Sequence, residues 1–322
     1  MRAVGFYEYG PAHVLQVLDL PELNAGQGEV RVKVYAAAIN PTDILSRTGA
    51  RRAPMGKTDA YANKQIADCP PYVPGMDIAG IVDQVGDGVD TGVNVGDSVV
   101  AMVVPKGAHG GYREQIVLKA NAVVPAPSVS NHVEACTLPM NALTARLSLD
   151  LLNLKAGQTL AVTGAAGAYG GYIIQLAKTE GLQVIADASD RDRELVVSLG
   201  ADLVLPRGDN IAQSIREHFP KGVDGLADGA VQNELVVDAV KDGGAFTAVR
   251  GYDGVPQRNL NFTQTWVRSY DEQFEKLSAL VKLVDDKKLT LRVADVFSPE
   301  DASIAHSRLE AGGTRGRLVL KF

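Results

Sequence analysis

The order of apolar and polar positions predicts a β-rich first part of the chain. Five short runs alternate in the way that half-buried strands do, and Gly, Pro or Asp separates them: residues 2–7, 29–36, 78–85, 98–104 and 112–119. Turn-forming residues at such short intervals are typical of a bent, largely antiparallel sheet. The segment 47–74 is long and polar, and we expect a surface loop with a little helix there.

From about residue 131 the pattern changes to apolar strands that alternate with amphipathic helices. A helical stretch over 133–152 comes first, strands follow at 183–188, 203–205, 224–227 and 245–249, and helices lie between them at 191–199, 211–218 and 233–240. This order predicts an α/β fold with a doubly wound parallel sheet. Helices at 271–285 and 302–311 and a strand at 317–322 complete the chain.

The run from residue 160 to 178 joins an apolar strand, a glycine-rich turn and an amphipathic helix. Glycines in the turn allow tight bending and a close backbone approach, and the helix N-terminus offers free N–H groups to a pyrophosphate. We therefore predict a dinucleotide site, with a merely structural turn as the alternative. Its backbone contacts would come from Gly164, Ala165, Gly167, Ala168, Tyr169 and Gly170.

This placement predicts three domain segments. Residues 126–262 would form the nucleotide-binding domain, inserted into a catalytic domain made of residues 1–125 and 263–322. A cleft would lie between the two domains.

The residues after the second strand of such a fold select the cofactor, because an acid there binds the ribose hydroxyls of NAD. The ribose-facing position is Ala188, which cannot bind a diol. NADPH is therefore the predicted cofactor, and a shift of register by one residue would put Asp187 there and favour NAD. Four side chains could hold the 2′-phosphate: Ser189, Arg191, Arg193 and Arg207. Capping of the next helix is the alternative role for this region.

Composition narrows the range of functions. The 322 residues carry a net charge of -6 with 46% hydrophobic residues, which predicts no nucleic-acid partner and no anionic membrane partner. No apolar stretch approaches the roughly 20 residues that span a bilayer. Cys69 and Cys136 are the two cysteines, too few for a disulfide framework, and we expect a cytoplasmic location. Arg47, Arg51 and Arg52 suggest a small basic patch.

Seven local patterns resemble one enzyme family in order and spacing. They are AAAINPTD at 36–43, PGMDIAGIV at 74–82, VGDSV at 95–99, LPMNALTA at 138–145, VTGAAGAYG at 162–170, LGAD at 199–202 and GRLVL at 316–320. Together they resemble the zinc-independent, zeta-crystallin-like quinone oxidoreductase branch of the medium-chain dehydrogenase/reductase superfamily. The resemblance implies a Rossmann domain inserted into a split GroES-like catalytic domain. It also implies a homodimer that pairs edge strands around residues 245–249.

The same resemblance implies the positions of the substrate and the nicotinamide. Asn40 would lie near both and could donate an amide N–H to a developing oxygen, although an Asn-Pro turn that ends a strand explains it equally well. Asp43 would order the loop beside it. The nicotinamide side would be formed by Thr144, Val249, Arg250 and Gly251.

The positions of zinc ligands in related alcohol dehydrogenases carry poor ligands here. They are Asn40-Pro41, Met76-Asp77 and the neighbourhood of Met140, so we expect no metal site. The sequence thus predicts an NADPH-dependent enzyme that transfers hydride to a quinone. Reduction of an activated C=C bond is the alternative within enzymes. A non-catalytic, NADPH-binding redox sensor is the alternative outside them.

Overall fold

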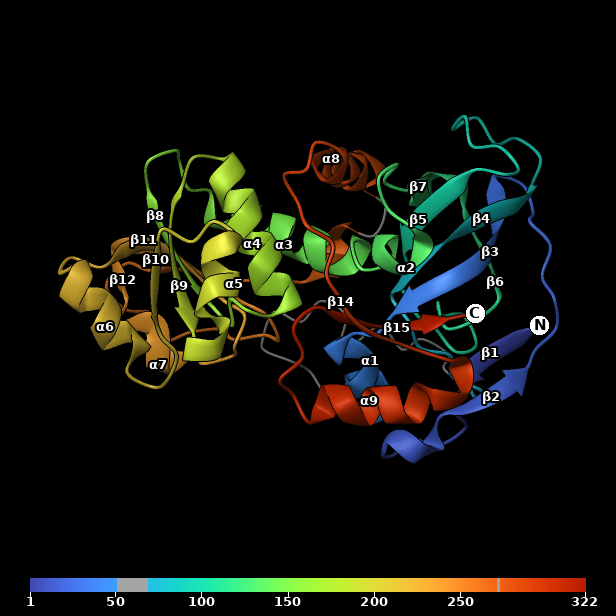
Figure 1. Cartoon of the computed structure of the whole chain (residues 1–322), viewed down its shortest axis with the longest axis horizontal. Helices are drawn as coiled ribbons and strands as arrows, with labels where there is room; N and C mark the ends of the chain where they lie inside the picture. The colour runs from blue at the N-terminus through green and yellow to red at the C-terminus, as the bar shows by residue number, and fades with distance from the viewer. Residues whose placement is uncertain (51–68, 271–272) are drawn as a thin grey trace.

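The computed structural model describes residues 1–50, 69–270 and 273–322, and Figure 1 shows two parts that lie side by side. The smaller part contains a parallel sheet with helices on both faces. The larger part contains the antiparallel strands and both chain termini. One cluster of buried apolar residues extends from one face of the parallel sheet through the junction into the larger part. A second cluster lies within the larger part, and a third lies on the other face of the parallel sheet.

The parallel sheet has six strands in the order β10-β9-β8-β11-β12-β13. Every neighbouring pair in it runs parallel. The bounds are β8 Thr159–Thr163, β9 Gln183–Ala188, β10 Leu203–Pro206, β11 Val223–Asp228, β12 Val240–Ala248 and β13 Asn261–Gln264.

Helices cover both faces of this sheet, which is what a parallel sheet requires because its two faces are apolar. Side chains of β8 and β9 alternate between the two apolar clusters. One face packs against α3 Pro139–Leu152, α4 Ala168–Thr179 and α5 Arg193–Ser198, and the other against α6 Ile211–His218 and α7 Glu234–Val237. The predicted doubly wound α/β fold is confirmed.

The larger part is built on a seven-stranded sheet that both ends of the chain form together. Its order is β14-β15-β3-β4-β5-β7, with β6 paired to β3, and β1 and β2 form a separate hairpin. The bounds are β1 Arg2–Gly5, β2 Gln16–Asp19, β3 Glu29–Ala38, β4 Asp77–Val85, β5 Ser98–Met102, β6 Gln115–Lys119, β7 Val123–Pro125, β14 Val293–Phe297 and β15 Arg317–Lys321.

The return of the chain to its first sheet confirms the split β-rich part. Strand β15 pairs antiparallel with β3, so Val319 lies opposite Ala38. Four helices accompany this sheet or the junction: α1 Pro41–Arg47, α2 His132–Ala135, α8 Phe274–Asp285 and α9 Ala302–Glu310. In the described part of the chain, no helix is long and apolar enough to cross a membrane.

Two expectations differ from the structure. The single helix predicted over 133–152 is interrupted, because Pro139 starts α3 as a new helix after α2. The strand expected at 245–249 is not an edge strand, because β12 pairs with β11 on one side and β13 on the other. The free edge on this side is β13, which runs to Gln264 and crosses the expected domain boundary at 262.

Candidate active site

The glycine-rich turn lies at the carboxyl end of β8, where α4 begins at Ala168 with Gly167 as its N-cap. Gly164 has a φ of +66°, a conformation that favours glycine. A Cβ on Gly170 would lie 2.5 Å from the Gly164 carbonyl oxygen, so the helix packs on the strand only with glycine there. The first N–H groups of α4 have no partner within the helix, and this cradle fits a pyrophosphate.

Tyr169 links the glycine-rich turn to α3 by a hydrogen bond. Its hydroxyl lies 2.7 Å from Ser148 Oγ, and Ser148 Oγ lies 2.8 Å from Thr265 Oγ1. The Tyr169 ring fills the space beside Gly229, where a Cβ would come within 2.7 Å of it. Burial raises the pKa of Tyr169, so the hydroxyl stays protonated. Tyr169 therefore fixes where the turn stands relative to α3.

Asp187, the acid near the end of β9, is turned toward the glycine turn. Its Oδ1 accepts a hydrogen bond of 3.0 Å from the Ala165 N–H, and the residue is only 5% exposed. Burial raises the pKa of this carboxyl above its ordinary value. Ala188, the expected ribose-facing position, is also buried. The carboxylate that would favour NAD is thus bound to the backbone of the turn.

The side chains expected at the 2′-phosphate fall into two groups. Ser189 Oγ donates to Asp192 Oδ2 at 2.5 Å, and Arg193 Nη1 donates to the Val204 carbonyl at 3.0 Å. Arg191 and Arg207 are exposed on the surface beyond β9 and β10. Arg191 Nε lies 3.8 Å from Asp192 Oδ2, a longer ion pair on an exposed side chain. Arg191 and Arg207 can therefore turn toward a bound phosphate without breaking a short hydrogen bond.

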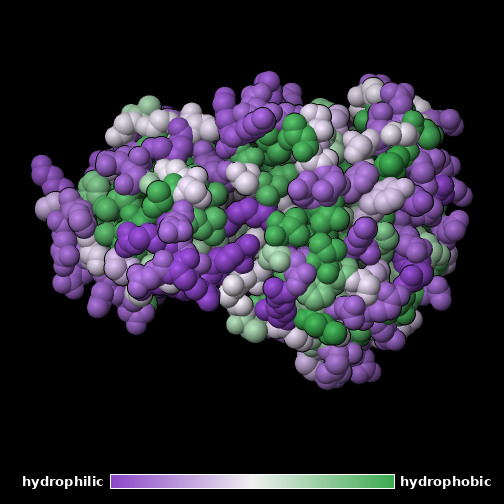
Figure 2. Space-filling view, viewed as in Figure 1, coloured by the Kyte–Doolittle hydropathy of each residue, from purple (hydrophilic) through white to green (hydrophobic). Residues whose placement is uncertain are grey.

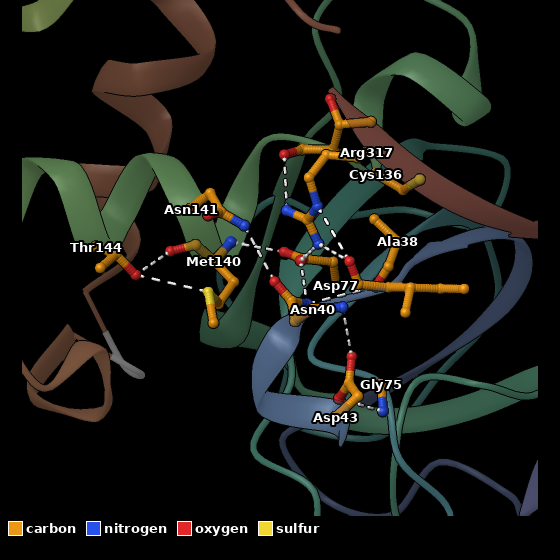
Figure 3. A network of polar contacts seen from close by, with 12 residues as sticks. Ala38, Asn40, Asp43, Gly75, Asp77, Cys136, Met140, Asn141, Thr144 and Arg317 are labelled. Atoms are coloured by element: carbon orange, nitrogen blue, oxygen red, sulfur yellow. Dashed lines mark hydrogen bonds and ion pairs between the residues drawn. The ribbon is translucent and has the colours of Figure 1, made fainter. Parts of the chain in front are cut away.

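A buried polar network fills the junction of the two parts, and Figure 3 shows it around Asn40. Asn40 Nδ2 donates to Asp77 Oδ2 at 2.9 Å and to the Ala38 carbonyl at 3.4 Å. Its Oδ1 accepts from Asn141 Nδ2 at 3.0 Å. Asp77 also receives Arg317 Nη2 at 2.9 Å, so a buried ion pair holds the network.

Asp43 secures the backbone around Asn40. Its carboxylate accepts hydrogen bonds from the N–H groups of Asn40 at 2.8 Å and Gly75 at 3.0 Å, and from the Tyr112 hydroxyl at 3.0 Å. Burial raises the pKa of Asp43 to about 6, and the three donors limit that rise. Asp43 thereby caps α1 and ties it to the segment that leads into β4.

Helix α3 connects this network to the glycine turn, and in Figure 1 it lies between the two parts. Its Met140 N–H donates to Asp77 Oδ1 at 2.6 Å, and Ser148 meets Tyr169 two turns later. Thr144 lies between them and donates its hydroxyl to the Met140 carbonyl at 2.6 Å. Residues four apart share one face of a helix, so these three side chains form one row.

The segment after β12 takes an unusual backbone path. Val249 N–H donates to the Asp228 carbonyl at 3.3 Å, and Arg250 and Gly251 then have φ values of +66° and +81°. A left-handed conformation is uncommon for a residue with a side chain. Arg250 is exposed, so its charge faces solvent. The roles expected for Val249, Arg250 and Gly251 stay predictions.

The structure also shows side chains that the sequence pattern did not single out. Asp77, Asn141 and Arg317 bind Asn40 or its partner, although all three lie inside the family-like patterns. Arg47 does not belong to a surface patch, because it is fully buried, donates to the Gly10 carbonyl at 2.6 Å and pairs with Glu310. Arg51 and Arg52 lie outside the described residues.

The donor chemistry at the junction differs from that of a metal centre. Within residues 1–50, 69–270 and 273–322, no three His, Cys, Asp or Glu side chains gather as a metal-binding group. Met76 is buried, and the Met140 sulfur lies 3.6 Å from the Thr144 hydroxyl. Figure 2 shows polar side chains along the visible junction, beside an apolar patch on the larger part.

Known proteins match the chain over most of its length. Residues 26–128 match the family described as alcohol dehydrogenase GroES-like domain, and residues 199–320 match the family described as zinc-binding dehydrogenase. The chain is 31% identical to 2-methylene-furan-3-one reductase of Solanum lycopersicum, over 99% of this chain and 79% of the relative. It is 33% identical to the chloroplastic NADPH-dependent alkenal/one oxidoreductase of Arabidopsis thaliana, over 92% and 76%.

A third relative is the quinone oxidoreductase of Mus musculus, with 28% identity over 99% of this chain and 97% of the relative. A solved mycobacterial protein in complex with NADPH shares 26% identity and a TM-score of 0.83 over the whole of both chains. An NAD-dependent alcohol dehydrogenase structure shares 29% identity and a TM-score of 0.85 over the same extent. The chain belongs to the medium-chain dehydrogenase/reductase superfamily of oxidoreductases.

Proposed function

We propose that this protein is a zinc-independent, NADPH-dependent reductase that delivers hydride to a quinone. The observation that carries the proposal is helix α3, which joins the glycine turn to the buried network around Asn40. Ser148 contacts Tyr169 of the turn, and at the other end the Met140 backbone N–H binds Asp77 and the Asn141 side chain binds Asn40. A dinucleotide held at the cradle would reach along α3 toward that network, where the substrate would bind.

NADPH supplies the hydride when it is bound, and the chain's own residues bind and orient it. The N–H groups at the start of α4 would hold the pyrophosphate, and Thr144 would lie on the nicotinamide side of the cleft expected between the two parts. Asn40, Asp43 and Asp77 keep the floor of the cleft rigid, because each is buried and fully engaged in hydrogen bonds. A rigid floor excludes water and keeps the reacting groups in place.

The choice of NADPH over NADH rests on Asp187, Arg191 and Arg207. Asp187 binds the Ala165 N–H instead of facing a ribose diol. The two exposed arginines offer the positive charge that a 2′-phosphate needs. The variant Arg191→Ala/Arg207→Ala should therefore raise the KM for NADPH by about tenfold or more, since a lost charge-assisted contact weakens binding by roughly this factor. Its KM for NADH should stay within twofold.

Independence from zinc rests on the donor set at the junction. Asn40 and Met140 stand where the superfamily's zinc enzymes carry ligands, and their polar atoms are already bound to Asn141, Asp77 and Thr144. Amide and thioether groups are poor zinc ligands. A metal ion would then have no part in polarising the substrate oxygen.

Reduction of an activated C=C bond is the second candidate. Two relatives with at least 31% identity are named for alkenal/one and 2-methylene-furan-3-one reduction. Both substrate classes present a conjugated carbonyl group to the same hydride position. The substrate would therefore be distinguished by the residues that line the cleft and not by the nucleotide site.

The proposal is tested by following NADPH oxidation at 340 nm with 1,4-benzoquinone and, separately, with but-3-en-2-one. Quinone-dependent oxidation with the larger kcat/KM supports the quinone reductase. A larger value with the enone supports the second candidate. Tight NADPH binding without turnover of either compound would favour the redox sensor. Absence of NADPH binding would contradict all three.

We also propose a homodimer and a cytoplasmic location. The free edge of β13 offers unpaired backbone groups that a second copy could extend across a twofold axis. Cys69 and Cys136 are both free thiols, which suits a reducing compartment. Sedimentation equilibrium tests the dimer. The Thr265 N–H donates to Ala248 of β12, so the alternating Gln264 N–H points to the free edge. Gln264→Pro removes that edge donor, so it should weaken a dimer built on β13, and a monomeric wild type would contradict the proposed dimer.

A further inference from the structure

Arg292 reaches from the larger part of the molecule onto the glycine turn. It lies just before β14, yet its Nη1 donates to the Ala166 carbonyl at 3.1 Å and its Nη2 to the Gly167 carbonyl at 2.6 Å. These two carbonyls belong to the turn that leads into α4. The guanidinium therefore joins the two parts of the molecule at the pyrophosphate cradle.

The sequence makes room for this contact with a second glycine. Gly170 is needed for packing on β8, but the neighbouring Gly171 has a different reason. A Cβ on Gly171 would lie 2.3 Å from Arg292 Nη2 and 3.1 Å from its Cζ. Any larger residue at 171 would push the guanidinium away from the turn. Gly171 and Arg292 thus form one structural unit.

The positive charge of Arg292 has no anionic partner within the described residues. Its neighbours in the same region do have one: Arg315 binds Asp192 through two bonds of 2.6 Å, and Arg317 binds Asp77. Arg292 is partly buried and binds only neutral carbonyls. Burial and the nearby Arg315 lower its pKa, and at neutral pH an arginine still carries its charge.

The contact acts on the N–H groups that would face a phosphate. The Gly167 carbonyl and the Ala168 N–H belong to the same peptide group. A cation on the carbonyl polarises that group, so its N–H becomes a stronger donor on the opposite side. The same charge adds to the positive end of the α4 dipole. An anion bound at the start of α4 would meet both effects.

We propose that Arg292, seated by Gly171, is a positioning residue for the pyrophosphate of the dinucleotide. It acts through the carbonyls of the turn and adds a positive charge that no carboxylate of the described residues neutralises. The inference rests on the proposed NADPH site and adds a residue that belongs to the other part of the molecule. Binding of the dinucleotide would then depend on how the two parts are held together.

The test measures dissociation constants by isothermal titration calorimetry for two ligands. One is 2′-phospho-ADP-ribose, which contains the pyrophosphate, and the other is 2′-AMP, which lacks it. Arg292→Gln should weaken 2′-phospho-ADP-ribose by about tenfold or more, the usual effect of losing one charge-assisted contact. It should leave 2′-AMP within about twofold. Arg292→Lys should recover part of the loss because it keeps the charge.

A second variant tests whether Gly171 makes room for the Arg292 guanidinium. Gly171→Ala should weaken 2′-phospho-ADP-ribose in the wild-type background and have little further effect in the Arg292→Gln background. Alanine stabilises a helix relative to glycine, so Gly171→Ala should not lower the thermal unfolding temperature, and the loss of binding would not be a loss of folding. In turnover assays, Arg292→Gln should raise the KM for NADPH and leave kcat and the quinone KM within about twofold.

Equal weakening of both ligands, or of neither, by Arg292→Gln would overturn the inference. Additive effects of the two variants would also overturn it, because they would show that Gly171 does not act through Arg292. A wild-type protein that binds neither 2′-phospho-ADP-ribose nor NADPH would contradict the proposed function itself. These results are distinguishable because the last one is seen before any variant is made.

Discussion

Removal of the Arg317 cation should destabilise the molecule more than any exposed charge can. Arg317 is 4% exposed and Asp77 is fully buried, with their atoms 2.9 Å apart. In Arg317→Met, the Asp77 carboxylate keeps the Asn40 and Met140 donors but loses the cation that is paired with it. Breaking one side of a buried ion pair costs about 3–5 kcal/mol, and we expect a loss of this size in the free energy of unfolding.

The assay is equilibrium unfolding in urea, followed by circular dichroism and by fluorescence. Lys282→Met is the control, because the Lys282–Asp286 pair is exposed and should contribute about 0.5 kcal/mol or less. The double variant Asp77→Asn/Arg317→Met should be more stable than Arg317→Met alone, since no buried charge is then left unpaired. A loss in Arg317→Met no larger than in Lys282→Met would refute the reasoning.

Three further predictions concern the turn, the loop and α3. Gly170→Ala should weaken NADPH binding at least about tenfold, because the new Cβ would lie 2.5 Å from the Gly164 carbonyl oxygen. Isothermal titration calorimetry measures the dissociation constant, and an unchanged value would contradict the prediction. Burial raises the pKa of Asp43 from 3.8 to about 6, so between these two pH values the native state holds a proton that the unfolded chain has released. The stability that this proton contributes is therefore present below pH 4 and is lost as the pH rises to about 6. In urea unfolding, Asp43→Asn should remove about 2 kcal/mol of the decline in stability between pH 4 and 7. An unchanged decline in the variant would count against the raised pKa. Tyr169→Phe should lower the free energy of unfolding by about 1 kcal/mol through the lost hydrogen bond to Ser148. Tyr172→Phe should lower it by less, because its hydrogen bond to Thr137 is 3.4 Å long. Equal losses would contradict the contact between Tyr169 and Ser148.

Local patterns predicted the elements best where burial and periodicity agree. The strand at 183–188 and the helix at 211–218 match β9 and α6 to the residue. Strands β13 and β14 were missed because they are short and partly exposed, so their apolar alternation is weak. The interruption before Pro139 was readable from the proline, whose ring and missing N–H favour a helix start.

The sequence predicted those parts of the candidate site that lie in one continuous stretch of the chain. The glycine turn is local, so its strand, turn and helix can be read in one stretch. The partners of Asn40 come from β4 and α3, and Arg317 of β15 binds Asp77 from 240 positions away, so no local pattern connects them. The contact between Arg292 and the turn is equally remote. Its one trace in the sequence is Gly171, a glycine that the turn itself does not need.

The central claim is a hydride-transferring enzyme that needs NADPH and no metal ion. The most direct measurement is kcat/KM with NADPH and 1,4-benzoquinone before and after prolonged dialysis against a strong chelator, with metal content determined on the same sample. The account predicts unchanged NADPH-dependent turnover at a zinc content far below one ion per chain. Loss of turnover that added zinc restores, or equal turnover with NADH, would contradict it.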